Sequence, residues 1–107
     1  MAKLNASVRN KGMMEIQRDE HGKKGAFYIE ENGEWVAEMT YVKSGDNEIT
    51  IDHTEVDKKL RGEGIGRDLL AEAVKYARAN GLKVKATCNY AKIALYENPE
   101  FKDVLAD

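Results

Sequence analysis

The sequence lacks the features that indicate a disulfide-bonded, zinc-binding, membrane-spanning or secreted protein. It contains one cysteine, Cys88, so no internal disulfide can form, and we expect a reducing, cytoplasmic location. That thiol and the two histidines, His21 and His53, match no zinc-binding spacing, so we expect no metal. No apolar run approaches the roughly 20 residues of a membrane span. No signal peptide is recognisable either, and we expect no membrane partner.

A surplus of positive charge is also missing. There are 17 Lys and Arg residues against 19 Asp and Glu, a formal net charge of −2. Such a chain has no basic field for a phosphate backbone, so we expect no nucleic-acid partner. Hydrophobic residues make up 42% of the 107 residues, enough for one core. We assign residues 12–107 to a single domain and residues 1–11, which show no periodicity, to a flexible tail.

The first part of the chain predicts short antiparallel strands. Two of them are indicated by pairs of apolar residues that alternate with polar ones, namely Met14 and Ile16, then Phe27 and Ile29. The charged, glycine-containing residues 18–25 read as the loop between them. Asn32-Gly33 then predicts a tight hairpin turn, because both of its residues accept positive φ.

Two longer strands follow the turn. The first begins near Trp35, and simple alternation places four of its residues on one face: Trp35, Ala37, Met39 and Tyr41. The second covers residues 48–56, and alternation again groups four residues on one face: Ile49, Ile51, His53 and Glu55. All four predicted strands should therefore form one antiparallel sheet.

The rest of the chain predicts alternating helices and strands. Apolar positions recur at helical spacing from Ile65 until Asn80-Gly81, which is a suitable helix end. A short strand over residues 82–87 completes a strand-helix-strand unit, which places its two strands parallel. We expect a second helix over residues 90–96 and a last short strand near residues 101–105.

The most informative segment is a glycine-rich loop before the long helix. Gly62, Gly64 and Gly66 occupy alternate positions there. Glycine admits unusual backbone angles, and the free N–H groups of a helix N-terminus favour anions, so the loop suits a phosphate. Tight packing alone is the alternative explanation. A Walker loop is excluded because Arg67-Asp68 stand where it needs Lys and Ser or Thr, and a dinucleotide fingerprint fails on glycine spacing.

The segment Arg61-Gly62-Glu63-Gly64-Ile65-Gly66 is similar to the pyrophosphate loop of the GCN5-related N-acetyltransferases, Gln/Arg-x-x-Gly-x-Gly/Ala. Asn89 and Leu95-Tyr96 keep the spacing of that family's last helix, and Phe101 resembles the aromatic residue that follows it. The resemblance implies an α+β fold: antiparallel strands, then a β-α-β-α-β half in which the two central strands are parallel and splayed.

The resemblance also implies acetyl-CoA as the co-substrate and names the residues that bind it. The loop would hold the pyrophosphate, with added charge from Arg61 and Arg67, and the backbone of Val56 would pair with the pantetheine arm. The implied cofactor-binding set is Val56, Arg61, Gly62, Glu63, Gly64, Ile65, Gly66, Arg67 and Asn89.

Departures from the family pattern concern the acceptor side. Members of the family place one or two helices between the first two strands, whereas this chain has only residues 18–25 there, so we expect an open acceptor side. Lys92 replaces an alanine, and Asn98-Pro99-Glu100 replaces Lys-x-Gly. These features resemble a minimal subgroup of small predicted acetyltransferases whose acceptor is generally not known.

Four residues are candidates for the chemistry. A primary amine, with a pKa of about 10.4, is almost wholly protonated at neutral pH, so transfer needs a base. His53 and Glu55 on the fourth strand are the candidate bases, with a purely structural role for His53 left open. Tyr96 resembles the family's proton donor to the departing thiolate, with packing as the alternative. Cys88, after the fifth strand, is either a nucleophile that relays the acetyl group or a small buried filler.

Two functions follow from these residues. The first is an N-acetyltransferase that passes the acetyl group of acetyl-CoA to a primary amine by direct attack. The second is a non-catalytic module that binds CoA or acyl-CoA as a sensor or interaction subunit. The acceptor could be a small polyamine or an amine of a protein, and a second subunit could supply the missing wall of its site.

Overall fold

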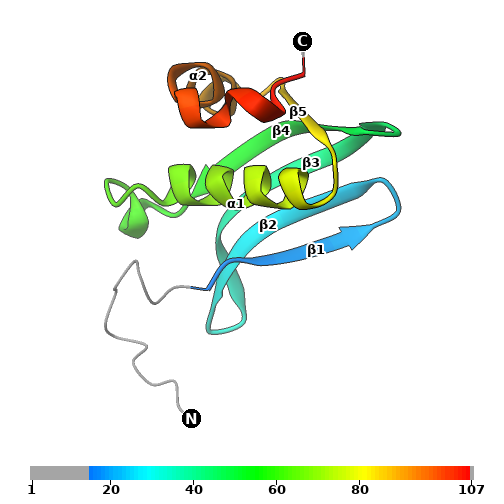
Figure 1. Ribbon diagram of the computed structural model, residues 1–107. Helices are drawn as coiled ribbons and strands as arrows, with labels where there is room; N and C mark the ends of the chain where they lie inside the picture. The colour runs from blue at the N-terminus through cyan, green and yellow to red at the C-terminus, as the bar shows by residue number, and fades with distance from the viewer. Residues whose placement is uncertain (1–14, 107) are drawn as a thin grey trace.

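The computed structural model describes residues 15–106, which form one mixed sheet with two helices on one face (Figure 1). The strands follow chain order across the sheet: β1 (Gln17–His21), β2 (Lys24–Glu31), β3 (Glu34–Gly45), β4 (Glu48–Val56) and β5 (Lys83–Ala86). The helices are α1 (Ile65–Ala79) and α2 (Asn89–Glu97), with 3-10 helices η3 (Lys58–Leu60) and η4 (Pro99–Val104). The predicted tail, residues 1–11, and Met14 lie outside the described residues.

The pairing of the strands confirms the predicted α+β fold. Strands β1 to β4 are antiparallel, and β5 joins β4 in parallel after the α1 crossover. Asn32 and Gly33 both have positive φ, 53° and 83°, as the predicted hairpin turn requires. Gly81, with φ of 67°, follows the end of α1. No helix in the described part of the chain has the length and apolar character needed to span a membrane.

Strand β1 corrects the prediction that residues 18–25 form a charged loop. Arg18 to His21 pair with β2, and only Gly22-Lys23 form the turn. The charged residues fit this strand because Glu20 accepts a 2.6 Å hydrogen bond from the hydroxyl of Tyr41 on β3. Strands are recognised in a sequence by alternating apolar residues, so a strand whose inward side chain is a paired carboxylate is not detected in this way.

A bulge at Val36 in β3 corrects the predicted face of Trp35. The register of β2 and β3 shifts by one residue at this point, which reverses the alternation. Trp35 is therefore 42% exposed on the face away from the helices, where its ring stacks on Tyr28 with centroids 3.9 Å apart. The other three residues predicted to share its face are buried on the helix side: Ala37, Met39 and Tyr41.

A second bulge, in β4, corrects the predicted grouping of His53 and Glu55 with the isoleucines. The pairing of β4 with β3 skips one residue at Asp52. Ile51 is fully buried beneath the helices, whereas His53 and Glu55 are exposed on the opposite face. The inverted alternation brings Thr54 to the helix side instead.

The segment after α2 is a 3-10 helix and not the predicted strand near residues 101–105. Phe101 and Val104, three residues apart, are both buried, as the period of η4 allows. Pro99 occupies the first turn, where its missing N–H has no cost. Leu105 alone makes a parallel bridge, to Val84 of β5.

Helix α1 positions the functional site through its buried face. Its apolar residues pack against β2, β3 and β4, which fixes the first turn of α1 near the end of β4 (Figure 1). These residues are Ile65, Leu69, Leu70, Ala73, Val74 and Ala77. We call the opposite side of the sheet the open face, because no helix among residues 15–106 covers it.

Candidate functional site

Strands β4 and β5 part halfway along β4. Their parallel register ends at the pair Ile51↔Ala86. Beyond that pair, the backbone N–H groups of Thr87 and Cys88 both donate to the carbonyl oxygen of Ile51, at 2.9 and 3.3 Å. Within the described chain, residues 52–56 have no strand partner on the β5 side. Their backbone groups on that side are open to an extended ligand.

A pocket of about 440 Å³, here called the loop pocket, opens where this free edge meets the first turn of α1. Its volume is in the range of small-molecule sites. The end of β4, the glycine-rich loop and one aromatic side chain of α2 line it. The lining residues are Thr54, Glu55, Val56, Leu60, Arg61, Gly62, Gly64, Ile65, Gly66 and Tyr90. Most of the predicted cofactor-binding residues are therefore brought together.

The glycines of the loop pocket are required by geometry. Gly62 and Gly64 have φ of 87° and 75°, which side-chain-bearing residues rarely adopt. A Cβ on Gly66 would lie 3.0 Å from the ring of Tyr90. Gly64 caps α1 without a side-chain hydrogen bond, and N–H groups of a first helical turn favour an anion.

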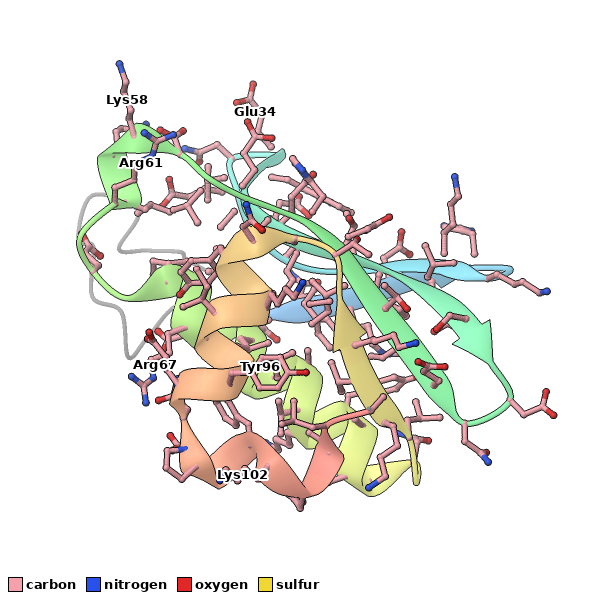
Figure 2. All side chains as sticks on the ribbon, turned by 90° about the horizontal axis from the view of Figure 1, so that it is seen from above. Glu34, Lys58, Arg61, Arg67, Tyr96 and Lys102 are labelled. Carbon is pink, nitrogen blue, oxygen red and sulfur yellow. The ribbon has the colours of Figure 1, made fainter. Side chains whose placement is uncertain are left out.

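The two arginines of the predicted set are held differently. Arg61 Nε donates to the carbonyl oxygen of Val56 at 3.1 Å, which keeps its guanidinium at the loop pocket. Arg67 donates to Asn98 Oδ1 at 2.8 Å and to Glu100 Oε2 at 3.1 Å. Figure 2 shows Arg67 on α1 pointing outward, well apart from Arg61. Arg67 is thus engaged by the segment that follows α2.

Two other predicted cofactor residues stand at the margin of this site. Glu63 is half-buried in the loop, and Asn89 is the exposed first residue of α2. Neither lines the loop pocket. Their roles stay predictions.

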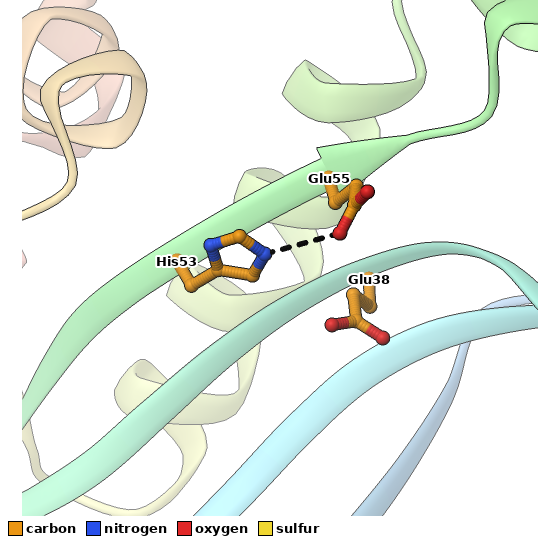
Figure 3. Close-up of side chains that lie close together, drawn as sticks. All are labelled: Glu38, His53 and Glu55. Carbon is orange, nitrogen blue, oxygen red and sulfur yellow. Dashed lines mark hydrogen bonds and ion pairs between the residues drawn. The ribbon is translucent and has the colours of Figure 1, made fainter.

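The candidate bases lie on the open face. His53 Nε2 is 3.3 Å from Glu55 Oε1, so imidazole and carboxylate contact each other (Figure 3). Glu38 of β3 stands directly opposite Glu55, and one ligand atom of each of the three residues lies within 4.8 Å of the others. One nitrogen and two oxygens form a donor set that a divalent cation can use. Sequence reasoning missed Glu38 because only the strand register makes it a neighbour.

Cys88 lies at the point where the strands part. Its Sγ is 3.3 Å from the hydroxyl oxygen of Thr54, and the pair bridges the ends of β4 and β5. Thr54 also lines the loop pocket. Alternation along β4 placed Thr54 on the wrong face, so sequence reasoning did not include it.

The two tyrosines of α2 have different surroundings. Tyr96 is 60% exposed and lines a separate hollow beside β5, outside the loop pocket (Figure 2). Tyr90 lines the loop pocket, and partial burial raises the pKa of its phenol. Sequence reasoning missed Tyr90 because its contact with Gly66 depends on how α2 packs on α1.

Comparisons with known proteins agree with this geometry. Residues 26–104 match the profile of the GCN5-related N-acetyl-transferase family. A GCN5-like protein of Staphylococcus aureus, solved by NMR, is 39% identical, with a TM-score of 0.67 over 87% of this chain and 88% of its own. Protein NATD1 of Gallus gallus is 32% identical over 78% of this chain and 77% of its own.

The fold is also shared with more distant structures. A Bacillus anthracis protein solved in complex with acetyl coenzyme A has a TM-score of 0.54 and 22% identity, over 72% of this chain and 47% of that one. The family profile covers well over half of the chain, including the glycine-rich loop and the parted strands. The chain therefore belongs to the GCN5-related N-acetyltransferase family.

Proposed function

We propose that this chain transfers the acetyl group of acetyl-CoA to a primary amine by direct attack. The observation that carries the proposal is the loop pocket, where the glycine loop, the free edge of β4 and the first turn of α1 converge. The loop and the helix N-terminus suit a diphosphate, and the extended edge suits the amide groups of pantetheine. Acetyl-CoA would supply a thioester whose acyl carbon an amine can attack.

The binding roles follow from the position of each residue. Gly62 and Gly64 let the backbone approach the diphosphate, and Arg61 adds a guanidinium fixed beside it. The backbone of Val56 is free to pair with the pantetheine arm. Arg67 would first have to leave its partners on the segment after α2.

In this proposal, His53 and Glu55 together deprotonate the amine acceptor. His53 removes a proton from the ammonium, and the carboxylate of Glu55 stabilises the imidazolium that forms. The neutral nitrogen forms the new N–C bond, the C–S bond breaks, and the sulfur leaves with the bonding electrons as a thiolate. The thiolate then takes a proton from an acid on α2, either Tyr96 after a rotation towards the loop pocket or Tyr90 within it. The nitrogen loses its second proton as it becomes the amide, and that proton returns through solvent to the tyrosine, while His53 releases its own proton to solvent.

The direct mechanism gives Cys88 no covalent role. Its contact with Thr54 provides packing at the point where the strands part. A relay through Cys88 would instead form a second thioester before the amine reacts. Cys88→Ala should therefore keep its activity under direct attack and lose it under a relay.

The experiment is to measure release of free CoA from acetyl-CoA across a panel of amines. His53→Ala should slow the release by about 10²–10⁴-fold, the usual contribution of a general base. His21→Ala is the matched control, because His21 is an exposed histidine of β1 remote from the loop pocket. Binding of CoA without amine-dependent release would favour the non-catalytic module over the enzyme.

A further inference from the structure

A second hollow shares a wall with the loop pocket. It has a volume of about 340 Å³, and Glu55, Val56 and Arg61 line both spaces. Its lining also includes Trp35 and Glu38, which places its mouth on the open face. The end of β4 therefore separates a space that suits CoA from a space that a second, smaller molecule can enter.

The mouth of this hollow carries an aromatic surface. Trp35 and Tyr28 stack with centroids 3.9 Å apart and an interplanar angle of 8°. Trp35 is 42% exposed, so part of its ring is open to solvent. The face of a tryptophan is the best of the aromatic surfaces for a cation.

Glu38, beside this surface, has no basic partner among the described residues. Glu38 and Glu55 are directly opposite each other in the β3–β4 register, and like charges in that relation are destabilising. In the described part of the chain, the ion pair of Glu55 is with His53, and no ion pair involves Glu38. Lys58 lines the hollow but points outward into solvent (Figure 2). Arg61 is directed to the backbone of Val56.

We infer that the acceptor is a small aliphatic amine with a second positive charge, and that Glu38 selects it. The inference rests on the proposed acetyl transfer. The reacting amine meets His53, and the second ammonium lies between Glu38 and the ring of Trp35. His53 and Glu38 have ligand atoms within 4.8 Å of each other, so a short chain between the two nitrogens is sufficient (Figure 3). The volume of the hollow suits a small molecule better than a folded partner.

The test compares three four-carbon amines and the longer spermidine at saturating acetyl-CoA. Butane-1,4-diamine and spermidine should show a kcat/KM at least about tenfold above that of butylamine, and 4-aminobutanoate the lowest value, because a lost contact to a charge is worth roughly one order of magnitude. Glu38→Gln should raise KM for the diamine about tenfold and bring the diamine-to-butylamine ratio of kcat/KM close to one. Glu97→Gln, on the exposed side of α2, is the matched control and should behave as wild type.

Three results would overturn the inference: equal kcat/KM for mono- and diamines, an unchanged diamine KM in Glu38→Gln, or a lysine-containing peptide that outcompetes the diamines. A binding measurement distinguishes a failure of the proposed acetyl transfer from a failure of the proposed diamine site. If CoA binds but no amine reacts, spermidine is titrated calorimetrically into the CoA-bound protein. Binding that Glu38→Gln weakens supports the hollow as a diamine site, and absence of binding contradicts it.

Discussion

At the scale of single residues, Glu20 shows how one carboxylate secures the edge of the sheet. Its Oε1 accepts hydrogen bonds from Arg18 and Tyr41, and its Oε2 lies 2.6 Å from Lys43 Nζ. The bond from Lys43, followed by that from Tyr41, lowers the pKa of Glu20 from 4.5 to about 2. These three partners come from β1 and β3, and the hydroxyl of Tyr76 on α1 donates to Oε1 at 3.5 Å, so the network spans β2 and reaches α1.

This network predicts a pH dependence of stability. Because the pKa of Glu20 is lower in the folded state, its stabilisation is complete above pH 4.5 and is lost as the pH falls towards about 2. Glu20→Gln should cost about 2 kcal/mol of unfolding free energy at neutral pH and flatten the acid slope. Urea denaturation at several pH values measures both. Parallel profiles for the variant and wild type would contradict the assignment, and Glu97→Gln should retain the wild-type slope.

Gly64 makes the second prediction at this scale. Gly64→Glu places a carboxylate where the diphosphate is proposed to bind and should abolish the rise in melting temperature that acetyl-CoA produces. Strain at positive φ would cost the fold about 1–2 kcal/mol. Gly81→Glu is the control, because Gly81 has φ of 67° at the other end of α1 and open space around it. A full acetyl-CoA shift in Gly64→Glu would show that the loop is misassigned.

At the scale of elements, β1 and β3 meet across a glycine. Glu20 pairs with Gly25 on one side, and Gly25 pairs with Tyr41 on the other. A Cβ on Gly25 would lie 2.3 Å from the Tyr41 ring, so the missing side chain lets the two long ones touch. The contact between Glu20 of β1 and Tyr41 of β3 therefore requires a residue without a side chain at position 25 of β2.

Gly25→Ala is expected to destabilise the sheet by about 1–3 kcal/mol, the range for an overpacked core. Gly45→Ala is the matched control, since its Cβ would meet only Glu48 atoms at 3.6 Å and beyond. Denaturant midpoints of the two variants give the comparison. A Gly25→Ala protein as stable as Gly45→Ala would mean that the Tyr41 ring moves aside without cost.

Elements set by local signals were predictable from the sequence, and elements set by strand pairing were not. The Asn32-Gly33 turn and α1 follow from residues adjacent in the chain, and the glycine loop from a short motif. The bulges at Val36 and Asp52 arise between strands, so alternation assigned Trp35 and His53 to the wrong faces. Glu38, Thr54 and Tyr90 entered the candidate site through such long-range contacts.

At the scale of the whole molecule, the two faces of the sheet carry different parts of the candidate site. The helix side forms the loop pocket, and the open face presents His53, Glu55 and Glu38. The pairing of β4 with β5 ends at Ile51 and Ala86, so in the described chain the part of β4 that contributes to both has no strand neighbour on the β5 side. The link between β1 and β2 is only Gly22-Lys23, so no helix stands between these two strands, and the open acceptor side expected from the sequence stays a prediction.

The most direct test of the central claim is a calorimetric comparison of CoA with pantetheine, which lacks the diphosphate and the nucleotide portion joined to it. If the loop over residues 61–66 and the first turn of α1 hold the diphosphate, CoA should bind with one site per chain. Pantetheine should bind at least about tenfold more weakly, since several charge-assisted hydrogen bonds are lost. Absence of heat with CoA, or equal affinity for the two compounds, would contradict the account.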